Sequence, residues 1–414
     1  MSRVMVIILA GGRGSRMGML CQERPKPLLP IAGKCRVIDF SLSNAVNSGL
    51  HNIAVAVDYQ RQVLKEYLGK GMPWRLDRCG KLATLEPRTE SYCGTSDAVY
   101  QNLSYIQASG ASLVLVLAAD HVYKMDYRRM LAFHENTGAH ATVAVTPVPL
   151  GEAHRFGLVT ADETGLVQGF VEKPAVPQSN LASMGIYVFS VEALARRLTE
   201  DAADPTSPHD FGHAIIPKMI RQDKVFAYKF SGYWQDIGEV TSYHRTNLRL
   251  AAGPLPFSLN GSWPVLTGAD TLPQDLADRQ GGKCLVGPRG IAQGWVMNSV
   301  LSQGVRIGSE AMVRDSVVMA GCVIGRHTVV ENCILDEGVT IGEFCYVGIR
   351  ANSPTDGGDI TVLGRGVAVP ARKAIGRGCQ IYPGVRAVDL TMRVIHHGAL
   401  VMPSEDQQEG GHHV

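Results

Sequence analysis

Glycine and positive charge gather in one short stretch near the start of the chain. The stretch LAGGRGSRMGMLCQERPKP, residues 9–27, contains four glycines, three arginines and one lysine. Small residues at four of the five positions 11–15 let a ligand approach the backbone closely, and successive N–H groups in such a turn form a nest for an anion. Arg16 and Lys26 would add charge-assisted hydrogen bonds. The stretch therefore predicts a binding site for a triphosphate.

Two common phosphate motifs do not account for this stretch. It lacks the G-x-x-x-x-G-K-[ST] pattern of the P-loop, and its glycine spacing differs from that of the dinucleotide-binding fingerprint. The alternative is a glycine-rich turn with a purely structural role. The basic segment RPKP, residues 24–27, favours the phosphate interpretation over that alternative.

The composition excludes several functions. A net charge of +2 over 414 residues gives no global field that favours nucleic acid or an anionic membrane. No apolar run approaches the roughly 18 residues that span a bilayer, and the first ten residues lack the length and cleavage site of a secretory signal. The nine cysteines are odd in number and include no C-x-x-C pair, which predicts reduced thiols in a cytoplasmic protein.

Residues 1–245 alternate between patterns typical of strands and helices, which predicts an α/β fold with a Rossmann-like, mostly parallel sheet. The expected order begins with strand 4–10, helix 40–50, strand 52–57, a helix over 96–110 capped by Ser96, and strand 112–120. Ligands of such sheets bind beyond the carboxyl ends of the strands. The glycine-rich stretch and Asp120 both lie at such ends.

The second half of the chain has a different pattern. Residues 246–280 are rich in proline and polar residues, which predicts a linker. From residue 281 to 404, Ile-Gly recurs at 307, 324, 341 and 375 with spacings of 17, 17 and 34. This period predicts a left-handed parallel β-helix, with a glycine-turned β-sandwich as the alternative. We expect the β-helix to serve assembly or regulation. Residues 348–360 break the repeat and are expected to form a loop, and 405–414 a flexible tail.

Several ordered sequence blocks resemble one enzyme family. ILAGGRGSRM followed by PKP resembles the sugar-1-phosphate nucleotidylyltransferases. AGKCRVIDFSLSNAVNSG, YCGTSDAVYQN and LAADHVYKMDYRRML are similar to blocks of the bacterial glucose-1-phosphate adenylyltransferases, and FVEKP, ASMGIYVF, HDFGHAIIP and YWQDIG follow in the family's order. The resemblance covers nearly the whole chain and makes residues 1–245 the expected catalytic domain.

This resemblance implies a reaction of ATP with glucose 1-phosphate that gives ADP-glucose and pyrophosphate, for the synthesis of glycogen or a related storage glucan. It implies Mg²⁺ bound by Asp120 and Asp236, with Arg16, Lys26 and Asp120 as catalytic residues. The implied nucleotide-binding residues are Leu9, Ala10, Gly11, Gly12, Gly14, Tyr92, Gly94, Thr95 and Asp97, with Gln60 a weaker candidate. The implied sugar-phosphate ligands are Gly157, Glu172, Lys173 and Ser183.

The sequence departs from the family pattern at four places. RPKPL replaces the usual RAKPA, Ala119 replaces a glycine before Asp120, and Cys93 replaces a basic or polar residue. These changes put the nucleotide preference and the rate in question. Glu23 stands where some bacterial members carry a basic residue of the activator site, which predicts altered or absent activation by sugar phosphates.

Three alternatives stay open at this point. The first is a nucleotidylyltransferase that uses dTTP or UTP, and the second is a regulatory subunit without catalysis. The third is a bifunctional enzyme whose β-helix transfers acyl groups with His327, His396 or His397 as a base. The resemblance further implies a homotetramer and small-metabolite effectors.

Overall fold

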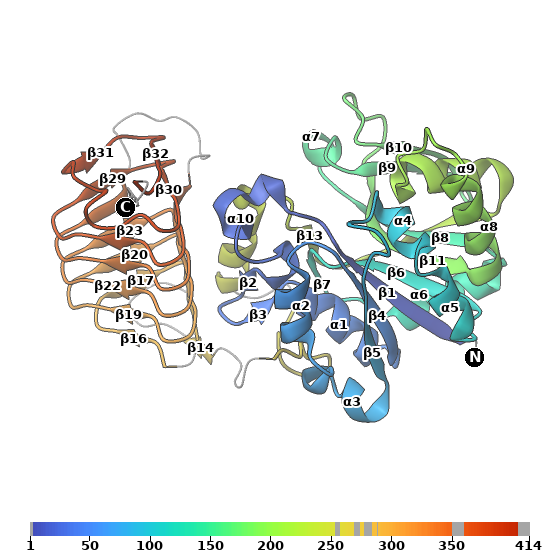
Figure 1. Cartoon of the computed structure of the whole chain (residues 1–414), viewed down its shortest axis with the longest axis horizontal. Helices are drawn as coiled ribbons and strands as arrows, with labels where there is room; N and C mark the ends of the chain where they lie inside the picture. Colours follow the sequence, from blue (N-terminus) through green and yellow to red (C-terminus); the bar gives the residue numbers. More distant parts are fainter. Residues whose placement is uncertain are drawn as a thin grey trace, which may run out of the picture.

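The computed structural model describes residues 3–252, 257–268, 274–276, 284–287, 289–349 and 360–404. Figure 1 shows two parts, an α/β part and a stack of short strands that coils beside it. The expected loop 348–360 lies largely outside the described residues, the expected linker 246–280 partly, and the expected tail 405–414 wholly.

The α/β part is built on a nine-stranded sheet. Its parallel half has the order β6-β1-β4-β5, with bounds β1 Val4–Ala10, β4 Asn52–Val57, β5 Lys81–Leu85 and β6 Leu113–Ala118. The continuous apolar runs of these strands are buried because helices cover both faces of the sheet. The expected α/β class with a mostly parallel sheet is confirmed.

The other half of the sheet carries the antiparallel pairs. Its strands are β8 Ala141–Pro147, β9 Gly157–Ala161, β10 Val167–Glu172, β11 Leu181–Ser190 and β12 Val225–Lys229. Strand β11 pairs antiparallel with β6, β8 and β9, and so joins the two halves. Two small ribbons stand apart from this sheet: β2 Pro30–Ile31 with β3 Cys35–Arg36, and β7 His121–Tyr123 with β13 Trp234–Asp236.

The helices are α1 Ile38–Asn47, α2 Arg61–Leu68, α3 Leu76–Cys79, α4 Thr95–Tyr100, α5 Leu103–Ala108, α6 Tyr127–Thr137, α7 Leu150–Ala153, α8 Val191–Ala202, α9 Ile216–Gln222 and α10 Val240–Ala251. Shorter helical turns are η1 Ser15–Cys21, η2 Lys26–Leu28, η3 Met72–Trp74 and η4 Phe211–Ile215. Helix α10 runs through residue 245, where the sequence pattern placed the end of the first domain.

The expected single helix over 96–110 is wrong in detail. The segment forms two helices, α4 and α5, because Asn102 leaves the helical conformation and its side chain donates to the Ala98 carbonyl at 2.9 Å. Gly94, not Ser96, precedes the first helix, and the Ser96 hydroxyl donates to Asp201 at 3.1 Å.

The second part is a β-helix with three sheets. One sheet contains β14 Gln274–Leu276, β15 Cys284–Val286, β18 Ser299–Leu301, β21 Val317–Val318, β24 Cys333–Leu335, β27 Thr361–Leu363, β30 Gln380–Ile381 and β32 Leu400–Val401. The second contains β16 Ile291–Ala292, β19 Arg306–Ile307, β22 Val323–Ile324, β25 Thr340–Ile341 and β28 Ala368–Val369. The third contains β17 Trp295–Met297, β20 Met312–Arg314, β23 Val329–Glu331, β26 Tyr346–Ile349, β29 Ala374–Gly376 and β31 Val394–Ile395.

The strand register reproduces the repeat seen in the sequence. Val318 pairs with Leu335, 17 residues further on, whereas Leu335 pairs with Leu363 after 28 residues. The longer step spans residues 348–360, where the sequence breaks its repeat. The inward side chains of successive coils form one apolar core, as the expected left-handed β-helix requires.

The two parts share a core. Met17, Leu20 and Leu29 of the glycine-rich stretch and its continuation lie in one buried cluster with Val317 and Ile334 of the β-helix. Helix α10 lies between the two parts (Figure 1) and contacts β15, β18 and β21. Within the described residues, no helix combines the length and the apolar character that a membrane crossing needs.

Candidate active site

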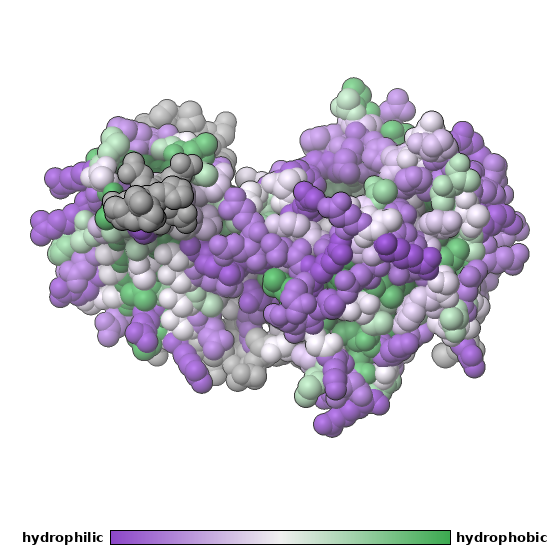
Figure 2. Space-filling model, in the orientation of Figure 1, coloured by the Kyte–Doolittle hydropathy of each residue, from purple (hydrophilic) through white to green (hydrophobic). Residues whose placement is uncertain are grey.

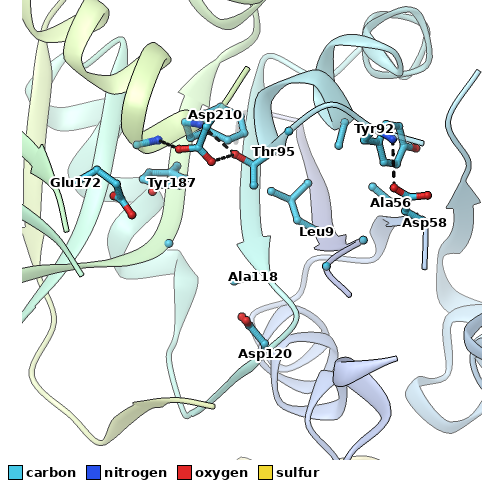
Figure 3. A pocket seen from close by; sticks show the side chains of 17 residues that line it. Leu9, Ala56, Asp58, Tyr92, Thr95, Ala118, Asp120, Glu172, Tyr187 and Asp210 are labelled. Carbon is cyan, nitrogen blue, oxygen red and sulfur yellow. Dashed lines mark hydrogen bonds between the residues drawn. The ribbon is translucent and has the colours of Figure 1, made fainter. Parts of the chain in front are cut away.

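A pocket of about 400 Å³ opens at the carboxyl ends of the central parallel strands. Leu9 of β1, Ala56 of β4 and Ala118 of β6 form its floor. Figure 3 shows two ends, one with Asp58 and Tyr92 and the other with Glu172, Tyr187 and Asp210. The location agrees with the ligand position expected for such sheets.

The pocket contains eight of the residues that the sequence singled out. They are Leu9, Gly11, Gly12, Tyr92, Gly94, Thr95, Asp120 and Glu172. Ala10 is buried at the end of β1. Asp97 accepts hydrogen bonds from Cys93 N at 2.8 Å and Gln101 Nε2 at 2.7 Å, and faces a neighbouring groove. Gln60 Nε2 donates to the Gln22 carbonyl at 3.2 Å and does not line the pocket.

Two carboxylates meet beside the pocket through the ribbon of β7 and β13. Asp236 pairs in register with His121, the residue after Asp120. His121 Nε2 lies 3.4 Å from Asp120 Oδ1 and 3.9 Å from Asp236 Oδ1, and the three groups offer ligand atoms within 4.8 Å of one another. His121 Nδ1 is buried without a hydrogen-bond partner. Two carboxylates at this separation fit a hard divalent cation, which prefers oxygen ligands.

Lys26 neutralises one of these carboxylates. Its Nζ donates to Asp120 Oδ2 at 2.6 Å, and its side chain is 9% exposed. Burial opposes both charges, but Lys26 and His121 hold the pKa of the Asp120 carboxyl well below its usual range. Burial likewise opposes the charge on Lys26, yet Asp120 and Asp236 raise the pKa of the ammonium group. Both groups are therefore charged at neutral pH.

The glycine-rich stretch forms the rim beside this pair. Gly14 directly precedes η1 and has a left-handed backbone, φ 66°, and a Cβ there would lie 3.1 Å from both Cys21 Sγ and Lys26 Cβ. Arg16 is exposed in η1 and lies close enough to oppose the charge on Lys26 electrostatically. The two cations that the sequence proposed for a triphosphate thus lie near each other.

At the opposite end of the pocket, the strands β9, β10 and β11 carry three of the residues expected to bind the sugar phosphate, Gly157, Glu172 and Ser183. Glu172 Oε1 accepts from Lys173 Nζ at 2.7 Å. A Cβ at Gly157 would lie 2.4 Å from the Phe170 ring and 2.5 Å from Glu172 Oε2, so a larger residue there would displace this ring or this carboxylate. Ser183 Oγ lies 3.4 Å from the Tyr187 hydroxyl, within the same wall.

Two further acidic residues were missed by sequence reasoning. Asp210 accepts from Thr95 Oγ1 at 2.8 Å and from the Gly212 and His213 N–H groups at 2.8 and 3.0 Å. Burial alone would raise the pKa of the Asp210 carboxyl, but its hydrogen bonds with His213 and Thr95 outweigh this effect, so the net shift of the pKa is downward. Asp58 Oδ2 accepts from Tyr92 N at 3.1 Å. The HDFG block contained the only sequence signal for Asp210.

Two of the three β-helix histidines considered above as bases make contacts of their own. His327 stacks on Phe344 with ring centroids 4.8 Å apart. His397 Nδ1 accepts from Arg377 N at 2.9 Å, which occupies the lone pair that a base would use.

Comparisons with known proteins agree with both parts of the fold. Residues 5–253 match the Nucleotidyl transferase family, and residues 282–370 match the GlmU-like, C-terminal hexapeptide family. The chain is 45% identical to a glucose-1-phosphate adenylyltransferase of Thermotoga neapolitana, over 98% of this chain and 100% of the relative. It is 44% identical to that of Thermotoga maritima over 98% and 100%. It is 42% identical to that of Clostridium acetobutylicum over 75% and 84%.

Gly94→Ala tests the contact between the two segments that close the pocket. A Cβ at Gly94 would lie 2.1 Å from the His209 carbonyl oxygen. We expect the free energy of unfolding, measured by denaturant titration, to fall by about 2 kcal/mol or more, because the backbone at residue 94 or at His209 must move to relieve the contact. Gly12→Ala is the matched control, since nothing lies within 4 Å of its Cβ. Equal stability of the two variants would contradict this packing.

Proposed function

The chain belongs to the glucose-1-phosphate adenylyltransferases, and from this premise we propose that it transfers the adenylyl group of ATP to glucose 1-phosphate. A phosphate oxygen of the sugar phosphate bonds to the α-phosphorus of ATP, the bond to the β-phosphate breaks, and pyrophosphate leaves. The products are ADP-glucose and pyrophosphate. We extend the proposal to ADP-glucose as a precursor of glycogen or a related storage glucan.

One observation carries the proposal: Asp120, to which Lys26 is bonded, lies between two differently built ends of one pocket (Figure 3). The end with Tyr92 and Asp58 adjoins the glycine-rich rim. The end with Glu172 offers carboxylate oxygens of the kind that hold sugar hydroxyls. Substrates bound at the two ends would meet beside Asp120. Such transfers depend on positioning and on charge stabilisation rather than on covalent chemistry.

The residues at the nucleotide end would bind and orient the triphosphate. Gly11 and Gly12 present backbone without side chains, and Arg16 and Lys26 supply positive charge. Arg16 is exposed and free to reach outward, whereas Lys26 is held beside Asp120. We assign Lys26 the task of holding the phosphates nearest the reacting α-phosphorus, where charge moves onto the leaving pyrophosphate.

The residues at the sugar end would orient glucose 1-phosphate. Glu172 would accept hydrogen bonds from sugar hydroxyls, and Gly157 leaves room beside it. Lys173 has a left-handed backbone, φ 44°, and is half-exposed beside Glu172. We assign Lys173 to the phosphate of glucose 1-phosphate as a point charge. Ser183 and Asp210 complete the wall around the sugar.

Asp120 and Asp236 are the residues that would hold Mg²⁺. Two carboxylates plus substrate phosphates are a usual ligand set for this ion, and the paired β7 and β13 bring the two carboxylates together. The chemistry that the ion supplies when bound is neutralisation of phosphate charge.

Other parts of the proposal rest on the resemblance. We retain a catalytic domain over 1–245, a linker over 246–280 and an assembly or regulatory domain over 281–404, in a cytoplasmic protein. Regulation by small metabolites belongs to the same proposal. Glu23 Oε2 forms an ion pair with Arg365 Nη1 at 3.4 Å. This pairing supports the altered activation by sugar phosphates that an acidic residue at position 23 predicts.

A homotetramer is supported by an apolar row on the β-helix. Outward side chains in register on the third sheet are Trp295, Met312, Val329, Tyr346, Ala374 and Val394. Trp295 and Tyr346 are 48% and 50% exposed. Figure 2 shows apolar patches over the β-helix among hydrophilic residues. Contiguous exposed apolar residues of this kind mark interaction surfaces.

A panel of ATP, dTTP, UTP and GTP, each with glucose 1-phosphate and Mg²⁺, tests the reaction by pyrophosphate release. We expect turnover mainly with ATP. Asp120→Asn removes a charge needed beside the phosphates and should reduce kcat by about a hundredfold or more, in the range of lost electrostatic stabilisers. Preference for dTTP or UTP would replace this function with the first alternative. Tight ATP binding without turnover would favour the regulatory subunit.

Tyr346→Lys tests the assembly surface. A charge in the middle of a buried apolar contact is costly, so we expect smaller particles than wild type by size-exclusion chromatography with light scattering. Val388→Lys is the control, because Val388 is 68% exposed outside the row. An unchanged mass for Tyr346→Lys, or a monomeric wild type, would contradict assembly through this face.

A further inference from the structure

The loop that carries Lys26 is also anchored in the β-helix. Arg24 lies two residues before Lys26, and its side chain is 5% exposed. Its Nη2 bonds to Asp336 Oδ1, and its Nη1 lies 3.2 Å from Glu337 Oε1. Both acidic residues follow β24, more than 300 residues away in sequence. The same short loop therefore contacts the β-helix through Arg24 and Asp120 through Lys26.

The link between these two cations is short and stiff. Pro25 separates them with an extended backbone, φ −70° and ψ 147°, and its ring fixes φ. Lys26 then begins the turn η2, in which Leu29 N donates to the Lys26 carbonyl at 3.1 Å. A displacement of the Arg24 backbone is therefore passed on to Lys26 through Pro25.

The acidic pair on the β-helix is itself held in place. Glu337 N donates to Asp336 Oδ1 at 2.6 Å, and the Asp336 side chain is 2% exposed. Arg365 Nη2 donates to Glu337 Oε2 at 2.8 Å. Arg36 Nη1 donates to Glu337 Oε1 at 3.3 Å and to the Leu28 carbonyl at 3.2 Å. The loop over residues 24–28 is thus fixed to the β-helix by Arg24 and, at the Leu28 carbonyl, by Arg36.

Apolar packing supports the same loop from the same side. Leu29 and Ile31 follow η2 and are fully buried in the cluster that includes Val317, Met319 and Ile334 of the β-helix. Met319 Sδ also lies 3.7 Å from Arg24 Nη1. The buried wall behind Lys26 is therefore made partly of β-helix residues.

We propose that Asp336 is a positioning residue for the transfer reaction: through Arg24 it fixes Lys26 beside Asp120, so that the β-helix completes the triphosphate site. This inference rests on the proposed function. It assigns the β-helix a part in catalysis that assembly alone would not require. Removing the negative charge of Asp336 leaves Arg24 buried with a weakened partner, and the loop between Arg24 and Lys26 loses its fixed position.

Asp336→Asn is the primary variant. We expect kcat/KM for ATP to fall by about ten- to hundredfold, the range for loss of a charge-assisted hydrogen bond. The KM for glucose 1-phosphate should stay within about twofold, because Glu172 and Lys173 lie at the other end of the pocket. Asp336→Glu keeps the charge and should recover most of the activity. Glu343→Gln is the matched control, since Glu343 pairs with Arg326 on the exposed β-helix surface at 2.9 Å.

A double-mutant cycle separates positioning from general destabilisation. In a Lys26→Ala background, Asp336→Asn should change kcat/KM for ATP by less than about twofold, because the group that it positions is gone. Full additivity of the two losses would overturn the proposal.

A second measurement does not depend on catalytic activity: the rate at which an amine-specific reagent acylates Lys26, followed by mass spectrometry. We expect slow labelling of Lys26 in the wild type and at least about fivefold faster labelling in Asp336→Asn, as exposure of a buried ammonium group predicts. Surface Lys65 is the internal standard. If the wild type shows no turnover but Lys26 is labelled faster in Asp336→Asn than in the wild type, the proposed function is contradicted and the positioning of Lys26 by Asp336 is not. If Asp336→Asn has the same Lys26 labelling rate and the same kcat/KM for ATP as Glu343→Gln, the positioning role of Asp336 is overturned.

Glu337→Gln covers the case in which Asp336→Asn does not fold. Glu337 is 25% exposed and makes the second carboxylate contact to Arg24. We expect faster Lys26 labelling and lower kcat/KM for ATP than in Glu343→Gln, in the same direction as for Asp336→Asn. Wild-type values for both would overturn the proposal.

Discussion

Negative charge is the main constraint on this site, and the buried Lys26–Asp120 pair is the interaction that resolves it. Two carboxylates, Asp120 and Asp236, are brought within reach of one another by β7 and β13. The proposed substrates add two groups of phosphates to the same space. Lys26 keeps the Asp120 carboxyl ionised and fixes its orientation before any substrate binds.

The pair in turn depends on the junction between the two parts of the chain. Lys26 lies in a three-residue turn that has little structure of its own to hold it. Its support comes from a cluster that contains residues of the glycine-rich segment, of α10 and of the β-helix. Protein interiors transmit small displacements. A displacement of the β-helix residues that contact Arg24 would therefore reach Lys26 through only three residues, Arg24 to Lys26.

Sequence reasoning identified the local features and missed those made by distant packing. Strands β1 and β4 match their expected bounds, since a continuous apolar run is a local signal. The repeat of 17 residues likewise predicted the β-helix. Asp120 and Asp236 were paired only through the family resemblance, since 116 residues separate them. Asp210 and the Arg24–Asp336 contact depend on which loops the sheet brings together, which no local pattern shows. Asp97, predicted to lie near the nucleotide, accepts a hydrogen bond from Cys93 N beside the pocket.

The most direct test of the role of the Lys26–Asp120 pair is a crystal structure with a non-hydrolysable ATP analogue, glucose 1-phosphate and Mn²⁺, whose anomalous signal locates the ion. We expect Mn²⁺ at Asp120 and Asp236 and a phosphate oxygen within hydrogen-bond distance of Lys26 Nζ. Phosphates bound away from Lys26, with no anomalous peak at the two carboxylates, would contradict this role.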